Sequence, residues 1–494
     1  MSRGRVAGKP PALQGEGTAA VLFCSYQFLL FFAVVFAIYW SLPWAQARVS
    51  LLVVASFTFY ASCNRWLALL VLGSTLADYL VALGLDALAC PRRRRLLVVF
   101  SVLMNLGLLV YFKYANFFLH SIEDALRASG ATASLPVLHV VVPVGISFYT
   151  FEAINYVVDV YRRRIPAERN LGHFLLFILF FPHLLAGPIV RARDFLPQIR
   201  APKRWSWGRF HLGGQLVLLG LFKKMVVADH MALFADPVFA NPAHFAPGTL
   251  WLAALAYALQ VYCDFSGYSD LAIGTAHMLG YKLAPNFNMP FLSRNMSEFW
   301  HRWHISLSTW IRDYVFIPLG GSRCGRWRTY RNLLLTMTLA GLWHGASWTN
   351  VAFGFIHGMF LLIHRAFRGA VEKRPPLDAL LRTRIGTAAR IALTFVCFVC
   401  SLVVFRCVTL AAGADMLGRM FAPRGSAMAW SDPLLVWMAL AVLALGHWIA
   451  QEGRWQRLRA RLPSAVRGLG YACFLLLILA LAPMTTRTFI YFQF

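Results

Sequence analysis

Charged residues are scarce in this chain of 494 residues: Asp, Glu, Lys and Arg together make up 14%, whereas hydrophobic residues make up 59%. A soluble protein of this length could not cover its surface with so few charged groups. The chain instead contains repeated apolar runs of about 20 residues, the length that a helix needs to cross a bilayer. The composition excludes a soluble globular protein and predicts an all-α, polytopic membrane protein, because a helix satisfies its backbone groups internally.

Acidic residues are especially rare, with 20 Asp and Glu against 47 Lys and Arg, which leaves a formal net charge of +27. The arginines cluster in short loops between apolar runs, as in Arg92–Arg95 and Arg162–Arg164. This pattern marks the cytoplasmic side of a membrane protein. No polar segment carries a basic face with interleaved aromatic residues, so nucleic acid is excluded as a partner and the lipid bilayer is expected instead.

Several familiar catalytic signatures are also absent: the sequence has no GxSxG, no Walker motif, no internal repeat and no low-complexity linker. The sequence therefore identifies no serine nucleophile, and no soluble catalytic domain is expected. Nine cysteines are scattered along the chain. The single CxxC pair, Cys397 and Cys400, falls inside a predicted span, which favours packing residues over a redox or zinc site.

The apolar runs predict about 11 to 13 transmembrane and re-entrant helices. Residues 1–18 are polar and rich in Gly and Pro, and they predict a disordered N-terminal tail before a single integral-membrane domain over 19–494. Residues 171–190 (LGHFLLFILFFPHLLAGPIV) have basic loops on both sides, which favours a re-entrant or in-plane helix broken at its prolines. An external loop is expected over 229–247. The predicted spans lie near 19–41, 48–63, 66–88, 95–117, 137–160, 208–228, 248–263, 332–346, 349–366, 389–411, 433–450 and 468–486.

The stretch 286–348 carries the chemistry that the rest of the chain would house. It holds three histidines, His301, His304 and His344, in strongly apolar sequence. Burying an ionisable residue at membrane depth costs free energy, so such a residue is expected to have a structural or functional role. His344, in GLWHGASW, would lie roughly 18 Å along a helix that starts near Asn332.

A neutral imidazole at the depth of His344 can act as a general base. Gly341 and Gly345 flank it and would let a substrate approach the helix closely. The alternative is a structural histidine, hydrogen-bonded to a neighbour in the core. From these residues alone both interpretations stay open.

Two further histidines lie in FWHRWHISLS. His301 and His304 are three residues apart, so on a helix they would share one face, and an HxxH pair can ligate a metal. No third ligand is obvious, and the mixture of aromatic and basic residues also suits a helix at the membrane interface.

A basic turn follows, with arginines that could receive the phosphates of a nucleotide-type donor such as coenzyme A, although ordinary topology explains them equally well. These residues are Arg323, Arg326, Arg328 and Arg331. Upstream, Asp264 and Asp270 in DFSGYSD are expected near a membrane boundary, either paired with arginines or lining a polar cavity.

Several blocks, taken in order, resemble one known family, the membrane-bound O-acyltransferases, and within it the branch of the alginate O-acetyltransferase membrane subunit. The blocks are PVGISFYTFEAINYVVDVYR (143–162), FFPHLLAGPIVR (180–191), DFSGYSDLAIG (264–274), NFNMPFLSRNMSEFWHRWHISLSTWIRDYVFIPLGG (286–321), GLWHGASW (341–348) and the terminal FIYFQF. The resemblance covers most of the chain. It implies the all-α membrane fold of that family, with 286–348 as the catalytic stretch.

The resemblance also implies roles for the histidines. His344 matches the histidine on which acyl transfer in the family depends. His304 matches a second polar position, which is histidine in this bacterial branch and Asn or Asp in many eukaryotic relatives. Relatives usually carry arginine where His301 stands, which weakens the HxxH metal hypothesis and makes His301 an interfacial bystander. We therefore expect His344 and His304 as catalytic residues and no metal.

The function implied by the resemblance is O-acetylation of an exopolysaccharide such as alginate. Acetyl-CoA is the expected donor, with no permanently bound cofactor, and acetyl groups would cross the bacterial inner membrane to periplasmic acetyltransferase partners and the polysaccharide machinery. One alternative is transfer of D-alanine or another acyl group to a cell-wall polymer or lipid. A non-enzymatic transporter or flippase is the other, because broken helices and buried histidines also suit transporters.

Overall fold

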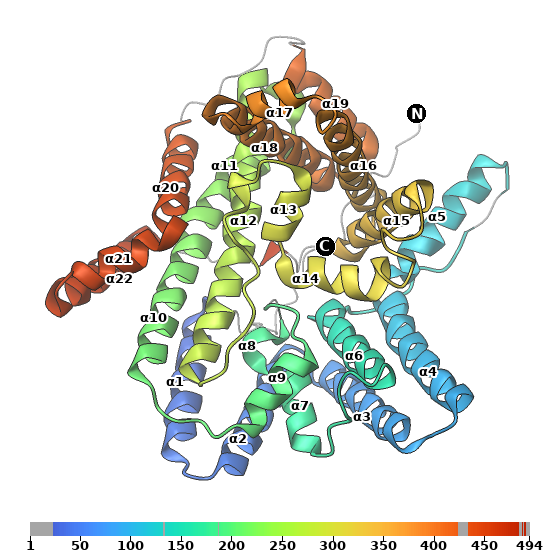
Figure 1. Ribbon diagram of the computed structural model, residues 1–494, viewed down its shortest axis with the longest axis vertical. Helices are drawn as coiled ribbons and strands as arrows, with labels where there is room; N and C mark the ends of the chain where they lie inside the picture. Colours follow the sequence, from blue (N-terminus) through green and yellow to red (C-terminus); the bar gives the residue numbers. More distant parts are fainter. Residues whose placement is uncertain are drawn as a thin grey trace.

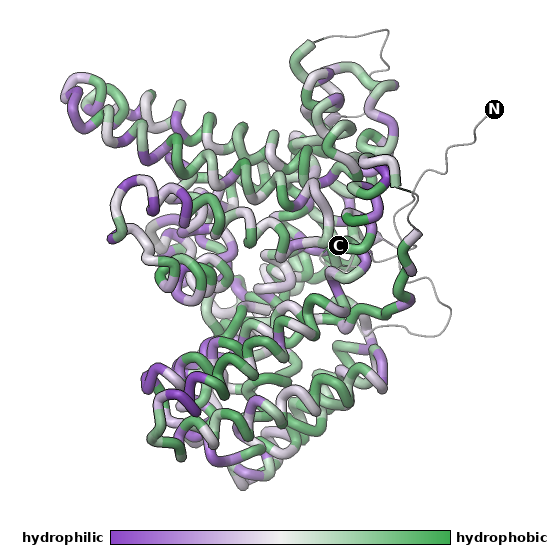
Figure 2. Tube along the Cα trace, turned by 90° about the vertical axis from the view of Figure 1, so that its right-hand side faces the viewer, coloured by the Kyte–Doolittle hydropathy of each residue, from purple (hydrophilic) through white to green (hydrophobic). Residues whose placement is uncertain are grey.

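The protein is built from helices, as the composition predicts (Figure 1). The computed structural model describes residues 23–131, 134–185, 187–422, 433–483, 487, 489 and 490, and within them no β-strand occurs. Hydrophilic residues gather mainly at helix ends and turns, and hydrophobic ones dominate the helix bodies (Figure 2). The predicted disordered tail, 1–18, lies outside the described residues, so the division into a tail and one membrane domain stays a prediction.

Five helical segments among the described residues are long and apolar enough to cross a membrane, or six if one bent pair counts as a single span. The five are Arg65–Ala87, Pro91–Ala128, Trp348–Val371, Arg384–Arg406 and Ser464–Leu481, and the bent pair is Leu434–Ala450 with Arg454–Arg461. Shorter apolar helices, Tyr26–Ser41 and Leu171–Leu184, fall below that length. The protein is thus a multi-pass membrane protein. The figure of 11 to 13 also includes short and re-entrant segments and stays a prediction.

The N-terminal third of the chain supplies most of the lower part of Figure 1. Its helices are α1 Tyr26–Ser41, α2 Ala45–Cys63, α3 Arg65–Ala87, α4 Pro91–Leu109, the π-helix η1 Val110–Tyr114, α5 Ala115–Ala128, α6 Ile146–Tyr161, α7 Leu171–Leu179, α8 Phe181–Leu184 and α9 Ala192–Arg200.

The segment 171–190 is broken, as expected for a re-entrant piece. Helix α7 has nine residues and ends at Leu179, and Pro182 lies in the first turn of α8. Neighbouring side chains satisfy the irregular backbone: Phe181 N donates to Ser56 Oγ at 3.0 Å, and Val190 N donates to a Glu152 carboxylate oxygen at 2.8 Å. Such backbone persists at membrane depth only where protein supplies these partners.

Helices α10 and α12 form the long antiparallel pair on the left of Figure 1. Between them two glycine pairs meet: a Cβ on Gly213 would lie 2.6 Å from Gly274 O, and one on Gly220 would lie 2.7 Å from Gly267 O. Close approach of small residues is how membrane helices gain packing energy without a hydrophobic driving force. The elements here are α10 Trp207–Leu221, the π-helix η2 Phe222–Ala228, α11 Asp229–Ala240, η3 Pro242–His244 and α12 Pro247–Met278.

Two sequence predictions in this region are wrong. Residues 229–247 are not a loop, because α11 continues directly from η2 to Ala240. The helix predicted over 248–263 does not end before the DFSGYSD block either, because α12 runs through this block without a break and buries Asp264 to 2% exposure.

The lysines of η2 explain this burial. Lys224 Nζ lies 2.8 Å from carboxylate oxygens of both Asp229 and Asp264, and Lys223 Nζ lies 2.6 Å from Asp270. The carboxylates thus pair with lysines rather than with arginines. The π-helical turn places two consecutive lysines against one face of α12, so the charges are satisfied inside the protein.

The C-terminal half surrounds the stretch 286–348 in the upper part of Figure 1. Its elements are η4 Pro290–Leu292, α13 Met296–Arg302, α14 Ile305–Ile311, the π-helix η5 Arg312–Phe316, α15 Arg326–His344, α16 Trp348–Val371, α17 Pro375–Arg382, α18 Arg384–Arg406, α19 Leu410–Phe421, α20 Leu434–Ala450, η6 Gln451–Gly453, α21 Arg454–Arg461 and α22 Ser464–Leu481.

Replacement of Lys224 by methionine should destabilise the protein, because it leaves two buried carboxylates without their cation. Removing one partner of a buried ion pair typically costs about 3–5 kcal/mol. The midpoint of thermal unfolding of the detergent-purified protein should therefore fall well below that of the wild type. The control is Lys373→Met, at an exposed position. Equal midpoints for the two variants would contradict a stabilising role for this network.

Candidate functional site

His304 occupies the break between two short helices, α13 and α14. Its φ of 44° and ψ of 54° lie in the left-handed region, which is uncommon outside glycine. Helix α13 ends at Arg302 because this backbone cannot continue a right-handed helix, and α14 starts at once, with Ser308 N donating to His304 O at 2.9 Å. The predicted common helical face of His301 and His304 is therefore wrong.

Asn286 holds this strained backbone in place. Its carbonyl oxygen accepts from Ile305 N at 2.9 Å, and its side-chain oxygen accepts from Ser306 Oγ at 2.6 Å. Its amide group in turn donates to Ser269 Oγ of α12 at 3.1 Å. A conformation that costs about 1–3 kcal/mol persists only where its surroundings over-determine it, and such positions cluster at functional sites.

The imidazole of His304 is fully enclosed, with 0% exposure. Its ring centroid lies 4.5 Å from that of Phe265, 5.9 Å from that of Trp343 and 6.5 Å from that of His344. Neither ring nitrogen has a hydrogen-bond partner within the described part of the chain. A buried polar ring without partners calls for an explanation, and a substrate that bonds to it is one.

His344 is the last residue of α15, and its carbonyl lies at a helix end where backbone acceptors lack partners within the helix. Lys113 supplies a donor: its Nζ lies 2.7 Å from Trp343 O and 3.3 Å from His344 O. The hydroxyl of Tyr114 donates to Leu342 O at 3.1 Å. A cation at a helix C-terminus also interacts favourably with the helix dipole. Helix η1 thus fixes the end of α15, and with it the position of His344.

Glycines serve helix packing here rather than substrate access. Helices α15 and α16 meet so closely that a Cβ on Gly341 would lie 2.7 Å from Gly354 Cα. The expectation that Gly341 opens a path to a substrate is therefore wrong. Its role is to bring α16 against α15, which encloses the His344 ring between Phe353 and Phe405, at centroid distances of 6.2 and 5.9 Å.

An aromatic stack connects the two histidine-bearing segments to α6. The rings of Phe151 and Trp310 are parallel, with centroids 3.8 Å apart, and Trp343 stacks on the other side of Phe151 at 5.5 Å. Trp310 Nε1 also donates to Phe151 O at 2.9 Å. Because Trp310 lies in α14 and Trp343 in α15, this stack sets the separation of the two segments and surrounds the site with aromatic rings.

The last described residues of the chain also reach the site. Phe489 is fully buried, with its ring 4.2 Å from Tyr268 and 6.0 Å from Phe265. The amide of Ile490 donates to an Asp264 carboxylate oxygen at 2.7 Å. Asp264 therefore connects the C-terminal segment to α12 beside the wall that encloses His304.

The structure brings together His304 and His344, as the sequence predicts, and separates His301 from them. His301 is exposed, and its Nδ1 lies 2.6 Å from Ser297 O within α13. Among the described residues, no group of three or more His, Cys, Asp or Glu is arranged to hold a metal ion. Lys113 was missed, although a lysine inside the predicted span 95–117 was a signal that it had an internal partner.

The basic turn lies at the start of α15, at the opposite end of that helix from His344. Its four arginines are exposed, and none has a carboxylate partner among the described residues. Asn332 organises the turn by donating to Leu319 O at 2.9 Å. The proposal that the arginines receive a donor's phosphates stays a prediction.

Comparisons with known proteins agree with this arrangement. Residues 136–407 match the model of the membrane-bound O-acyltransferase family, over a range that includes both histidines. The chain belongs to the membrane-bound O-acyltransferase family. It is therefore an O-acyltransferase, and not the non-enzymatic transporter or flippase that its buried histidines also allowed.

The names of the relatives differ in the acyl group that is transferred. The chain is 42% identical over 406 residues to the probable alginate O-acetylase AlgI of Pseudomonas syringae, which covers 81% of this chain and 75% of that one. It is 38% identical to the peptidoglycan O-acetyltransferase of Helicobacter pylori, over 65% of each chain. It is 33% identical to the teichoic acid D-alanyltransferase of Streptococcus thermophilus, over 45% of this chain and 57% of that one.

Lys113→Met should slow catalysis, because it removes the ammonium that holds the carbonyls of Trp343 and His344. A small displacement of a catalytic group costs up to about a hundredfold in rate, so kcat should fall about ten- to a hundredfold with KM for the acyl donor little changed. Steady-state kinetics of the purified enzyme measure both. Tyr114→Phe, which removes one hydrogen bond to the same helix end, is the matched variant and should lose less. Unchanged kcat in Lys113→Met would contradict a positioning role, and Lys113→Arg should recover part of the activity.

Proposed function

We propose that this protein transfers acetyl groups from acetyl-CoA across the bacterial inner membrane, for O-acetylation of a secreted polysaccharide such as alginate. The observation that carries the proposal is the pair of enclosed histidines, with ring centroids 6.5 Å apart at the end of α15. That separation lets the acceptor hydroxyl lie at one ring while the carbonyl oxygen of the acetyl group lies at the other.

The two histidines would divide the work of acyl transfer. His344 takes the proton from the hydroxyl of the acceptor, whose oxygen then attacks the carbonyl carbon of the acetyl thioester. As the carbon–sulfur bond breaks, His344 returns this proton to the departing sulfur, and free coenzyme A leaves. His304 donates a hydrogen bond to the carbonyl oxygen of the acetyl group, where negative charge develops in the transition state.

The dry surroundings suit this chemistry. Phe265, Trp343 and Phe353 enclose the rings, and a low local dielectric strengthens a hydrogen bond to a developing oxyanion. Exclusion of water also protects a reactive acyl group from hydrolysis.

Similarity to the relatives favours an acetyl group over a D-alanyl group as the group transferred. Those named alginate O-acetylase match this chain at higher identity and over a larger share of it than those named teichoic acid D-alanyltransferase. Transfer of D-alanine or another acyl group to a cell-wall polymer or lipid is the second candidate. Periplasmic partner proteins, including an acetyltransferase, would carry the acetyl group from this enzyme to the polymer.

The decisive test is acetyl transfer by the protein reconstituted in liposomes. With acetyl-CoA as donor and an alginate oligosaccharide as hydroxyl acceptor, wild-type protein should release free coenzyme A, whereas His344→Asn should lose about 10²–10⁴ in rate, the usual contribution of a general base. His304→Asn should keep more activity than His304→Ala, because an amide can still donate a hydrogen bond but cannot act as a base.

His244→Ala is the control, since this exposed histidine lies in η3. Wild-type rates in His344→Asn would refute the assignment of the base. Turnover with a D-alanyl thioester and none with acetyl-CoA would refute the acetyl proposal and establish the second candidate.

Deletion of the gene should remove O-acetyl groups from one secreted polysaccharide, because the enzyme supplies the acetyl groups for that polymer. NMR of each purified polymer measures the acetyl content, and expression of the wild-type gene should restore it where the His344→Asn gene does not. Unchanged acetylation of every secreted polymer would contradict a role in exopolysaccharide modification.

A further inference from the structure

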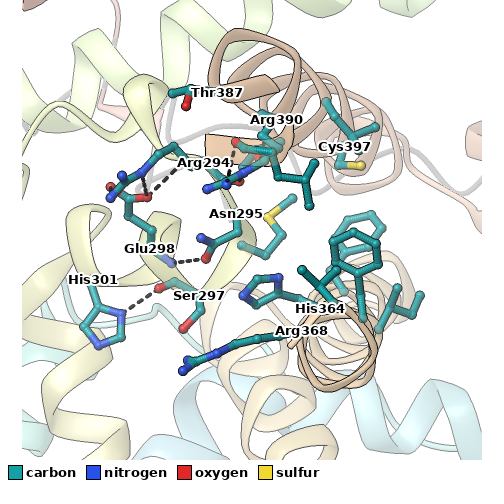
Figure 3. Close-up of a pocket in the computed structure, with 18 of the residues that line it drawn as sticks. Arg294, Asn295, Ser297, Glu298, His301, His364, Arg368, Thr387, Arg390 and Cys397 are labelled. Carbon is teal, nitrogen blue, oxygen red and sulfur yellow. Dashed lines mark hydrogen bonds and ion pairs between the residues drawn. The ribbon is translucent and has the colours of Figure 1, made fainter. Parts of the chain in front are cut away.

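A cavity of about 1240 Å³ opens between α13, α16, α17 and α18, away from the two histidines (Figure 3). Neither His304 nor His344 lines it. We call it the arginine groove, after the five arginines in its lining, Arg294, Arg302, Arg368, Arg382 and Arg390.

The groove carries an excess of positive charge. Arg294 and Arg302 share one carboxylate, that of Glu298, at 3.0 and 2.8 Å. Burial alone would raise the pKa of Glu298, but hydrogen bonds from Arg294 and Arg302 outweigh it and lower the pKa, so this carboxylate stays ionised. One cation of the pair is thus left without an anion.

Arg390 adds a second uncompensated cation beside the first. Its guanidinium donates to two backbone carbonyls, Arg294 O at 3.4 Å and Leu381 O at 3.2 Å, and it has no carboxylate partner in the described ranges. The remaining arginines are neutralised: Arg382 pairs with Asp378 at 2.8 Å, and Arg368 pairs with Glu372 at 2.9 Å. The excess charge therefore concentrates where Arg294 meets Arg390.

The opposite wall of the groove is mostly apolar, although His364 and Arg368 also line it from α16. Phe360, Ile363 and Phe367 line it from α16, and Leu393 and Cys397 line it from α18. Both helices are long and apolar enough to span the membrane, yet Ile363 is 59% exposed and Leu393 is 64% exposed. Figure 3 shows Arg294, Glu298 and His301 on one side of the cavity and Cys397 on the other.

The position of the charges along these helices matches a membrane surface. Arg368 lies in the last turn of α16, Arg390 lies in the second turn of α18, and the short α17 joins the two. The connection between α16 and α18 is basic, with Lys373, Arg374 and Arg382, and basic connections mark the cytoplasmic side of a membrane protein. A ligand here meets cations at the level of lipid headgroups and apolar side chains deeper in the membrane.

We propose that the arginine groove binds one anionic phospholipid of the surrounding membrane. Its phosphate would bind Arg390 and Arg294, and an acyl chain would lie along Phe360, Phe367 and Leu393. Basic pockets between membrane helices on the cytoplasmic side have the chemistry to recognise such headgroups. A soluble nucleotide would gain nothing from a wall that opens to the hydrocarbon.

The bound lipid would also act on the catalytic stretch. Arg294 precedes α13, and Arg302 is the last residue of α13, two residues before His304. A phosphate on Arg294 would hold α13 against α18 and so stabilise the strained backbone at His304. The lipid thus couples membrane composition to the site without touching the reacting groups.

Native mass spectrometry of the full chain tests the proposal directly. Protein released from nanodiscs that contain equal amounts of phosphatidylglycerol and phosphatidylcholine should retain one phosphatidylglycerol. In Arg294→Gln/Arg390→Gln this preference should fall at least about tenfold, since two arginines at a membrane surface are lost. The control is Arg92→Gln/Arg93→Gln, which removes the same charge from two exposed arginines at the start of α4.

Each outcome decides the proposal. Retention of both lipids to the same extent by the wild type, or an unchanged preference in the double variant, overturns it. Displacement of phosphatidylglycerol by free coenzyme A, with loss of coenzyme A binding in the double variant, also overturns it and makes the groove a donor site.

If the double variant fails to fold, Arg390→Gln alone tests the same lipid preference, because this substitution breaks no ion pair. A loss of preference in Arg390→Gln that Arg390→Lys largely restores supports the phosphate contact. The lipid readout does not depend on acetyl transfer, so failure of the proposed function would leave this test intact.

Discussion

Hydrocarbon offers no hydrogen bonds, and every polar group that this chain brings to membrane depth must therefore find its partner within the protein. Three irregular places depend on that constraint. Ser56 and Glu152 satisfy the broken segment after α7, Asn286 satisfies the backbone around His304, and Lys113 satisfies the end of α15. All three places come close to one another around the two histidines. The polar interior of the protein is thus also its reactive centre.

The same constraint bears on the three π-helical turns found in the described part of the chain. Helix η1 carries Lys113, helix η2 carries Lys223 and Lys224, and helix η5 continues α14 toward the basic turn. In the first two, the wider turn aims a charged side chain at an internal partner while the helix continues through the membrane. Single π-turns inside helices are frequently found at functional sites. Helices α5 and α11 continue directly from such turns, whereas the apolar pattern predicted a span that ends at 117 and a loop that starts at 229.

The sequence predicted the long helices and the two site histidines, but it did not predict the breaks and contacts that connect these helices. Apolar runs predicted α2, α3 and α20 to within about three residues at both ends, because length and hydrophobicity specify them. Other ends were missed by more: α6 starts nine residues after the predicted 137, and α12 runs 15 residues beyond the predicted 263. His304 and His344 were identified because ionisable residues stand out in apolar sequence, and the family match adds weight. The break at His304 was missed, because its cause is a tertiary contact with Asn286, 18 residues upstream, and FWHRWHISLS reads as one continuous helix. Gly341 was misinterpreted for a related reason: only the position of α16 shows which side of a glycine is filled.

Glycine pairs and aromatic stacks set the rigid frame, and the two antiparallel pairs, α10 with α12 and α15 with α16, use the same device of backbone contact. Between these pairs lies the short α13, whose ion pairs, Arg294–Glu298 and Arg302–Glu298, stay within its own segment. Its buried Phe299 packs against Phe398 of α18, with ring centroids 4.7 Å apart. The protein therefore combines glycine-mediated backbone contact around His344 with aromatic packing beside His304.

The left-handed backbone at position 304 has a consequence for variation at this site. Outside glycine, this conformation is tolerated best by histidine, asparagine and aspartate, and it is hostile to β-branched side chains. These are the polar residues that can serve the acyl group there, so geometry and chemistry select overlapping sets. The backbone conformation at position 304 thus restricts this position to a few amino acids, independently of the reaction. Both natural variation and directed evolution should therefore accept fewer amino acids at position 304 than the catalytic role alone would allow.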